Sequence, residues 1–338
     1  MISINEKKVS DRFKDFEKKI NTLDKKAISA LKKQKEWYNL DPNQLKWINS
    51  IIEFIEREKI GLIDISFEKL KEVVDKFETV KNGDVLVDRQ VRKNKARVIR
   101  KKFKDVIIDA LNYEDLKNKL FKEFFSEIDI KTCVYCNSQY AITIEKTKND
   151  FQARFQFDHI YPQEKYPHLS ISILNLVPSC STCNNVKSSK ELEFKPYTDG
   201  KTSKDYGFVL DKKSVINYFT TFNKSIIQFN FTDSDYNSQL NDTSLENNFQ
   251  ISKIYNEHKD IAEEIILNSY VYNNIHAQDL KDFIKSKMPN NKIPFERLFI
   301  GNYLDNDDLL RRPMAKFTKD IFDEIQILKS DIDKKLKI

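Results

Sequence analysis

The chain has 338 residues, of which 40% are apolar and 12% aromatic, with only five Gly and eight Pro. This composition excludes a disordered or collagen-like chain and is typical of a globular, helix-rich protein with roughly two or three domains. No stretch approaches the roughly 18 consecutive apolar residues of a membrane span, and the first residues lack the apolar core of a signal peptide. We therefore expect a cytoplasmic protein with no membrane partner. The net charge of +6 gives modest support to a nucleic-acid partner.

Residues 1–125 show apolar side chains at helical spacing among dense Lys and Glu, which predicts an N-terminal helical region. The clearest helix is expected at about 43–57. Asp41 is suited to its N-cap and Pro42 to its first helical position, where the missing N–H of proline costs nothing.

A basic run follows, because Arg92 to Lys104 contains eight basic residues and no acidic one. Val98, Ile99 and Phe103 are spaced to give a helix one apolar stripe, so the run predicts a basic amphipathic helix. Such a helix can lie along a DNA backbone, where phosphate contacts release counterions. The alternative is a solvated helix face. The candidate nucleic-acid-binding residues are Arg92, Lys93, Lys95, Arg97, Arg100 and Lys101.

The four cysteines of the chain form two pairs, Cys133-x2-Cys136 and Cys180-x2-Cys183. In a reducing cytoplasm, paired cysteines are more often metal thiolates than disulfides. Four thiolates in two such pairs predict a tetrahedral structural Zn²⁺ site. The 43 residues between the pairs exceed those of a simple zinc ribbon, so they should form a substructure whose ends the metal joins.

That substructure is expected to begin with a β-hairpin of residues 140–144 and 151–157, which show period-two patterns on either side of a polar turn. The hairpin would place Asp158 and His159 at the end of its second strand. A Pro-containing loop, including Leu174 to Pro178, would then lead to the second cysteine pair and a short helix at 184–189.

Asp158 and His159 form the only Asp-His dipeptide of the chain. The pair suits phosphodiester hydrolysis, since the carboxylate can hold a hard divalent cation while the imidazole removes a proton from water. Asp158 and the amide oxygen of Asn184 suit Mg²⁺, which thiolates do not, so the sequence implies two different metals.

The succession Asp158-His159, Asn175 and Asn184-x2-Lys187 between the cysteine pairs resembles the HNH endonuclease family. The resemblance covers about 133–190 and implies a ββα-metal fold stabilised by zinc. By similarity, His159 is the general base, Asp158 and Asn184 hold Mg²⁺ or Mn²⁺, and Asn175 orders the loop that aims His159. Lys187 would bind phosphate. Asn185 rivals Asn184 as metal ligand, because sequence does not fix a helix start to one residue.

His168 lies in the same loop and could be a second residue on the phosphate side or a packed loop histidine. Beyond Pro196, a strand is expected at 226–231, and helical spacing returns at 251–266 and 317–328. The expected fold class is thus α+β and mostly α-helical, with three regions: N-terminal helices (1–125), a central HNH module (126–200) and a mainly helical C-terminal region (201–338).

Short stretches at 254–261, 301–304 and 311–313 are similar to HNH proteins of bacterial anti-phage systems of the Septu-like kind. This resemblance implies an ATPase or other defence-system subunit as a partner of the helical flanks. A single active site that must cut both strands of a duplex favours a homodimer or sequential nicking.

The leading interpretation is a metal-dependent HNH endonuclease acting on DNA in phage defence or restriction. Three alternatives stay open at this point. One is a zinc-stabilised DNA-binding module without catalysis, one is an RNA-directed nuclease with the same site, and one is an interaction subunit that uses its helical flanks.

Overall fold

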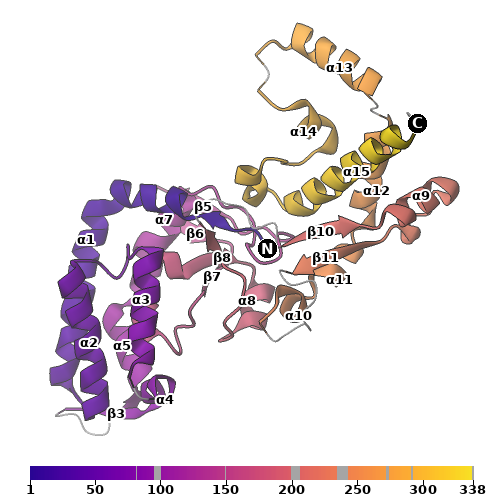
Figure 1. Ribbon diagram of the computed structural model, residues 1–338. Coiled ribbons are helices and arrows are strands. Elements are labelled where there is room, and N and C mark those ends of the chain that lie inside the picture. Colours follow the sequence, from indigo (N-terminus) through magenta and orange to yellow (C-terminus); the bar gives the residue numbers. More distant parts are fainter. Residues whose placement is uncertain are drawn as a thin grey trace. The chain divides into compact units, whose positions relative to one another are not determined.

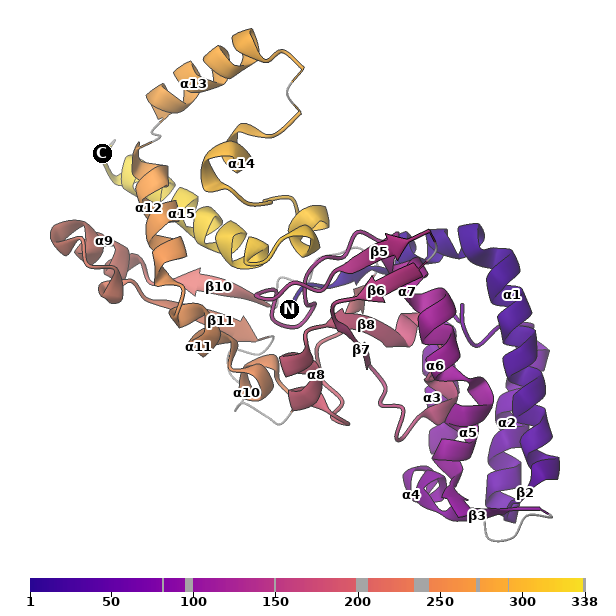
Figure 2. The ribbon, with the colours of Figure 1, turned by 180° about the vertical axis from the view of Figure 1, so that it is seen from behind.

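The computed structural model describes residues 1–80, 82–94, 100–148, 150–198, 206–233, 243–271, 274–290 and 292–336. It is mostly helical with several small sheets (Figures 1 and 2). The chain divides into two compact units. The site unit comprises Ser3–Ile130 and Ala141–Lys201, and the C-terminal unit comprises Met1–Ile2, Lys131–Tyr140 and Thr202–Ile338. The expected regions 1–125 and 126–200 thus share most of one unit.

The site unit contains the N-terminal helices and the central strands. Its helices are α1 (Glu6–Trp37), α2 (Pro42–Glu58), α3 (Phe67–Glu78), α4 (Gly83–Asp88), α5 (Phe103–Leu111), α6 (Tyr113–Leu116), the π-helical turn η1 (Lys117–Phe121), α7 (Lys122–Ser126) and α8 (Ser181–Lys187). Its strands are β1 (Ile4–Asn5), β2 (Tyr38–Asn39), β3 (Gln90–Lys93), β4 (Arg100–Lys102), β5 (Thr143–Thr147), β6 (Asp150–Ala153), β7 (Gln156–His159), β8 (Leu176–Ser179) and β9 (Tyr197–Thr198). Strand β1 pairs in parallel with β9.

Helix α2 confirms the helix expected at 43–57 and its N-terminal signals. The Asp41 carboxylate accepts hydrogen bonds from the backbone N–H groups of Asn43 and Gln44, and the Gln44 side chain accepts from the Asp41 N–H. Helices α1, α2, α3 and α5 lie side by side (Figures 1 and 2). Between them, the buried Trp47 ring packs edge-on against Phe103, with ring centroids 5.3 Å apart.

The basic run is not one helix, which corrects the expectation. Arg92 and Lys93 lie in β3, and Arg100 and Lys101 lie in β4, which pairs antiparallel with β3. Lys95, Arg97 and the rest of 95–99 lie outside the described residues. The backbone of β3 pairs with β2 directly after α1, and Phe103 is buried as the first residue of α5. The pairing of β3 with its neighbouring strands and the burial of Phe103 therefore decide the local structure. The apolar stripe that predicted a helix does not decide it.

The central hairpin also differs from the expectation. Strand β5 pairs with β6, but the chain bends at Arg154 and Phe155, and the dyad lies on a separate strand, β7. Strand β7 pairs antiparallel with β8, in the segment expected to be a loop, with Asp158 opposite Val177 and His159 opposite Leu176. Helix α8 follows directly and begins three residues before the expected start. All four residues of β8 are buried, so it lacks the alternating pattern that marks a strand.

The C-terminal unit combines a two-stranded sheet with helices. Strands β10 (Tyr206–Leu210) and β11 (Phe229–Asp233) pair antiparallel, so the strand expected at 226–231 begins three residues later. Around them lie α9 (Lys212–Thr221), α10 (Leu245–Phe249), α11 (Ile251–Asn256), α12 (Lys259–Val271), α13 (Asn274–Lys287), α14 (Phe295–Ile300) and α15 (Ala315–Leu336). Phe208, Phe229, Tyr255 and Phe317 form its aromatic core.

The helices expected at 251–266 and 317–328 are present, the first as two helices with a break between α11 and α12. Over the part of the chain that the structure describes, none of the helices combines the length and the hydropathy needed to cross a membrane.

Candidate active site and cysteine cluster

A pocket of about 460 Å³ opens in the site unit beside the Asp-His dyad. Asp158 and His159 from β7 line it, as does Asn184 from α8. The wall also includes Tyr113, Lys117 and Lys122 from α6, η1 and α7, which the sequence did not single out. No sequence motif marks these three residues. Their side chains reach the same pocket because of a π-helical turn, which apolar periodicity does not predict.

His159 is 8% exposed and its ring is held in one orientation. Its Nε2 lies 3.0 Å from the backbone oxygen of Ser170, and its ring centroid is 5.2 Å from that of Tyr113. Because a carbonyl oxygen only accepts hydrogen bonds, Nε2 must carry the proton of the neutral ring. The second nitrogen, Nδ1, is then an unprotonated base.

The pKa of His159 is lowered to about 4, chiefly because burial disfavours the charged ring. The hydrogen bond to Ser170 opposes this shift, and the positive charge of Lys187 adds to it. His159 is therefore neutral at neutral pH, which is the state in which an imidazole can accept a proton.

The Asp158 carboxylate forms a buried ion pair with Lys187. The Lys187 Nζ lies 3.1 Å from Oδ2 of Asp158 and 3.3 Å from Oδ1, and it donates a 2.7 Å hydrogen bond to the backbone oxygen of His159. The Lys187 side chain is only 1% exposed. The expectation that Lys187 binds phosphate does not fit this position. Its ammonium is paired with the Asp158 carboxylate and bonded to the His159 backbone oxygen, and Lys187 is absent from the pocket lining.

Asn175 is fully buried and links the two ends of the loop between β7 and β8. Its Oδ1 accepts from the Tyr161 N–H at 2.8 Å, and its Nδ2 donates to the backbone oxygens of Tyr161 and Leu169. The same loop is fixed to the segment between α2 and α3, because Ser172 Oγ donates to the Leu62 oxygen. The carbonyl of Ser170 that orients His159 is therefore held from both sides.

Asn184 and Asn185 differ in where they point. Asn184 lines the pocket, and its Nδ2 donates to Oε1 of Gln156 at 2.8 Å. Its Oδ1 is then the atom available to a cation. Asn185 is exposed and lies outside the pocket lining. A carboxylate and an amide oxygen at one pocket are the hard donors that Mg²⁺ or Mn²⁺ takes alongside water and substrate phosphate.

The other candidate residues that the structure describes do not line this pocket. Arg92, Lys93, Arg100 and Lys101 are absent from its lining, and Lys101 pairs with Asp109 at 2.5 Å. His168 is fully buried between aromatic rings, 5.1 Å from Trp47 and 5.8 Å from Phe77 by ring centroids. Burial lowers its pKa to about 3. His168 is thus a packed core residue, not a phosphate ligand.

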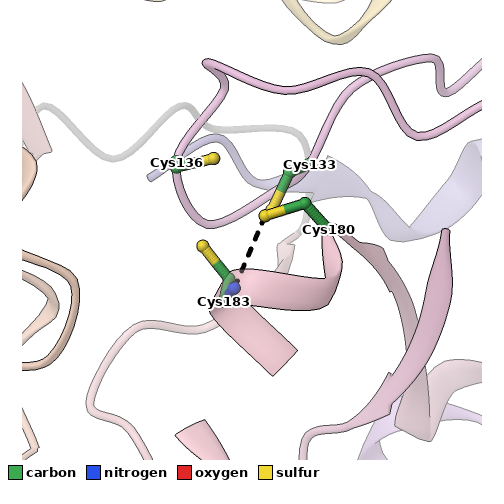
Figure 3. Close-up of side chains that lie close together, drawn as sticks. All are labelled: Cys133, Cys136, Cys180 and Cys183. Atoms are coloured by element: carbon green, nitrogen blue, oxygen red, sulfur yellow. Dashed lines mark hydrogen bonds between the residues drawn. The ribbon is translucent and has the colours of Figure 1, made fainter. Parts of the chain in front are cut away.

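The four cysteine sulfurs turn toward one another (Figure 3) and lie within 4.8 Å of each other, with all four residues buried. Cys180 caps α8, and its Sγ accepts from the Cys183 N–H at 3.5 Å. Asn137 closes the turn after Cys136 with a left-handed φ of 53°, which Asn tolerates. Four thiolates with a metal–sulfur distance of about 2.3 Å fit tetrahedral zinc, so the cluster suggests a zinc site.

The middle of the chain matches a known protein family. Residues 133–190 match the model of the HNH endonuclease family. Neither the curated proteins nor the solved structures gave a match to this chain. The matched segment contains the Asp-His dyad, Asn175, Asn184 and the two cysteine pairs. The middle of the chain therefore carries an HNH endonuclease domain, and that family generally comprises nucleases.

Proposed function

We propose that the protein is a metal-dependent HNH endonuclease that hydrolyses phosphodiester bonds of DNA. The observation that carries the proposal is the convergence of Asp158, His159 and Asn184 on one pocket, with His159 neutral and its Nε2 bonded to a carbonyl. Strands β7 and β8 with helix α8 would be the ββα unit of the domain.

In this proposal Nδ1 of His159 takes a proton from a water molecule as its oxygen attacks phosphorus in line with the leaving group. The new P–O bond forms while the bond to the 3′ oxygen breaks, and the departing oxygen takes a proton from solvent water, leaving 5′-phosphate and 3′-hydroxyl ends. Asp158 and Asn184 would hold Mg²⁺ or Mn²⁺. When bound, such an ion neutralises charge on the phosphate and on the departing oxygen.

Two buried residues would position this machinery without touching the substrate. Lys187 would hold the Asp158 carboxylate at the end of β7 through its ion pair. Asn175 would hold the loop whose Ser170 carbonyl selects the tautomer of His159. Cys133, Cys136, Cys180 and Cys183 would bind a structural Zn²⁺.

Cleavage of supercoiled plasmid by the purified full chain tests the function. We expect nicked or linear product with Mg²⁺ or Mn²⁺ and none with excess EDTA. Asn184→Ala should require far more Mg²⁺ for half-maximal cleavage than Asn185→Ala, which serves as the matched control on the same helix. Cleavage that EDTA does not affect would contradict the metal site. So would an Asn184→Ala variant that needs no more Mg²⁺ than Asn185→Ala.

We also propose that the nuclease acts as an effector of anti-phage defence or restriction, working with an ATPase or other subunit. The support is the sequence similarity of the C-terminal stretches described above. Plaque assays on cells that carry the protein with its neighbouring genes would test this. The proposal requires fewer plaques with wild type than with His159→Ala, and equal numbers would remove the defence role.

A further inference from the structure

Two lysines from outside the matched segment face the candidate active site. Lys117 opens the π-helical turn η1, and Lys122 is the first residue of α7. Both are half-buried, and both line the pocket that contains Asp158 and His159. The N-terminal helices thus supply positive charge to a pocket whose other wall carries the dyad.

The π-helical turn explains why both lysines face the same way. Residues five apart on a regular α-helix of 3.6 residues per turn point about 140° apart, so one lysine would turn away from the pocket. Here the Lys122 N–H donates to the Lys117 oxygen in the i to i+5 pattern of a π-helix. The wider turn brings the two side chains to one side, and such turns are frequent at functional sites.

Ring contacts connect this wall to the dyad. The Tyr113 ring packs against His159 with centroids 5.2 Å apart, and the Lys117 Nζ lies 5.6 Å from the Tyr113 centroid. The Lys117 ammonium therefore lies near the Tyr113 ring, and that ring packs against the imidazole of the candidate base. A DNA strand with its scissile phosphate at His159 would bring its neighbouring phosphates to this wall.

The partners of the two lysines are easily exchanged. Lys117 pairs with Glu114, whose side chain is 72% exposed, and Lys122 donates to the neutral amide oxygen of Asn118 at 2.6 Å. Exposed pairs of this kind contribute little stability. Lys187, by contrast, is buried against Asp158. The lysine charge that a phosphate in this pocket would meet is therefore that of Lys117 and Lys122, and the pocket lining also includes the carboxylates of Asp158 and Glu164.

We propose that Lys117 and Lys122 form a phosphate-binding subsite that holds the DNA backbone next to the scissile bond. This inference rests on the proposed nuclease function and adds to it residues that lie outside the matched domain. Each lysine would release counterions on binding a phosphate, so each would contribute to the salt dependence of DNA affinity.

The test measures binding of a short labelled duplex by full-length protein carrying His159→Ala, so that no DNA is cut. Salt is varied from about 50 to about 200 mM. Adding Lys117→Gln and Lys122→Gln together should weaken binding about tenfold or more and flatten the slope of log K against log salt by about 1.8, or about 0.9 for each lysine. Lys119→Gln is the matched control, since Lys119 lies in the same turn, is 65% exposed and is absent from the pocket lining.

The double variant Lys117→Arg with Lys122→Arg should bind like the parent, because it keeps both charges. Each single Gln variant should flatten the slope by about half as much, which keeps the question decidable if the Gln pair does not fold. Gln variants that bind and respond to salt as Lys119→Gln does would overturn the subsite while leaving the nuclease intact. A wild-type protein that neither binds nor cuts DNA would instead remove the proposed function, and the subsite with it.

Discussion

At the scale of single residues, Lys187 and Asp158 form a buried ion pair in the site unit. Both side chains are at most 5% exposed, so each charge depends on the other. Lys187→Met should lower the free energy of unfolding by about 3–5 kcal/mol, because it leaves a carboxylate buried without its ammonium. Urea unfolding measures this change.

A double-mutant cycle with Asp158→Asn checks the cause. The variant carrying both substitutions should be more stable than Lys187→Met alone, since the buried negative charge is gone. Strictly additive losses would show that Lys187 stabilises the fold by packing alone.

Asp24 gives a pH-dependent prediction. Its Oδ1 accepts from the backbone N–H groups of Leu62 and Ile63, and burial raises its pKa to about 7, against 3.8 for an ordinary Asp. Since the folded-state pKa is the higher one, the contribution of Asp24 to stability is complete below about pH 4 and is lost as pH rises through 7.

Asp24→Asn keeps an acceptor for both N–H groups and removes the charge. It should be more stable than wild type at about pH 8, on the order of 2 kcal/mol, and lose this advantage toward about pH 4. Thermal unfolding at both ends of this range provides the measurement. An effect of equal size at every pH would exclude titration of Asp24 as its source.

At the scale of elements, the N-terminus of α2 depends on one capping residue. Asp41→Ala removes the acceptor for the Asn43 and Gln44 N–H groups and should cost about 1 kcal/mol. Asp41→Asn keeps a capping oxygen and loses only the exposed pair with Arg89, so it should cost much less. Chemical denaturation of the two variants compares them, and equal losses would assign the effect to the ion pair.

Local signals predicted α2 because its cap, its proline and its apolar face all agree. They missed β8, since a strand buried on both sides shows no alternation, and its pairing with β7 joins residues 17 or more positions apart in sequence. They also misread the basic run, where pairing with β2 decides the structure. From the sequence, the dyad and Asn184 are candidates by their chemistry and the cysteines by their spacing, and the role expected of Asn175 is implied by the HNH resemblance. Lys117 and Lys122 become candidates only once the fold is known.

At the scale of the whole molecule, the N-terminal helices support the candidate site directly. Ser172 and Ile173 of the loop before β8 bond to Leu62 and Ile63, and the N–H groups of those two residues are held by Asp24 of α1. A chain of contacts thus runs from α1 to the carbonyl that orients His159. The helical region is therefore part of the support of the site, in addition to any role in binding a partner.

The cysteine cluster should govern stability of the whole chain. We expect one zinc per chain by elemental analysis, and a fall in thermal stability when a strong chelator removes it, because metal binding contributes directly to folding free energy. Cys136→Ser should lose both the zinc and the chelator effect. Retention of full stability in the zinc-free protein would assign the cluster to packing alone.

We propose His159 as the general base of this nuclease. Single-turnover cleavage of labelled duplex DNA at saturating Mg²⁺, by wild type and by His159→Ala of equal thermal stability and equal DNA affinity, tests it most directly. We expect a rate lower by about 10²-fold or more for the variant, the usual contribution of general base catalysis. Equal rates for the two proteins would contradict it.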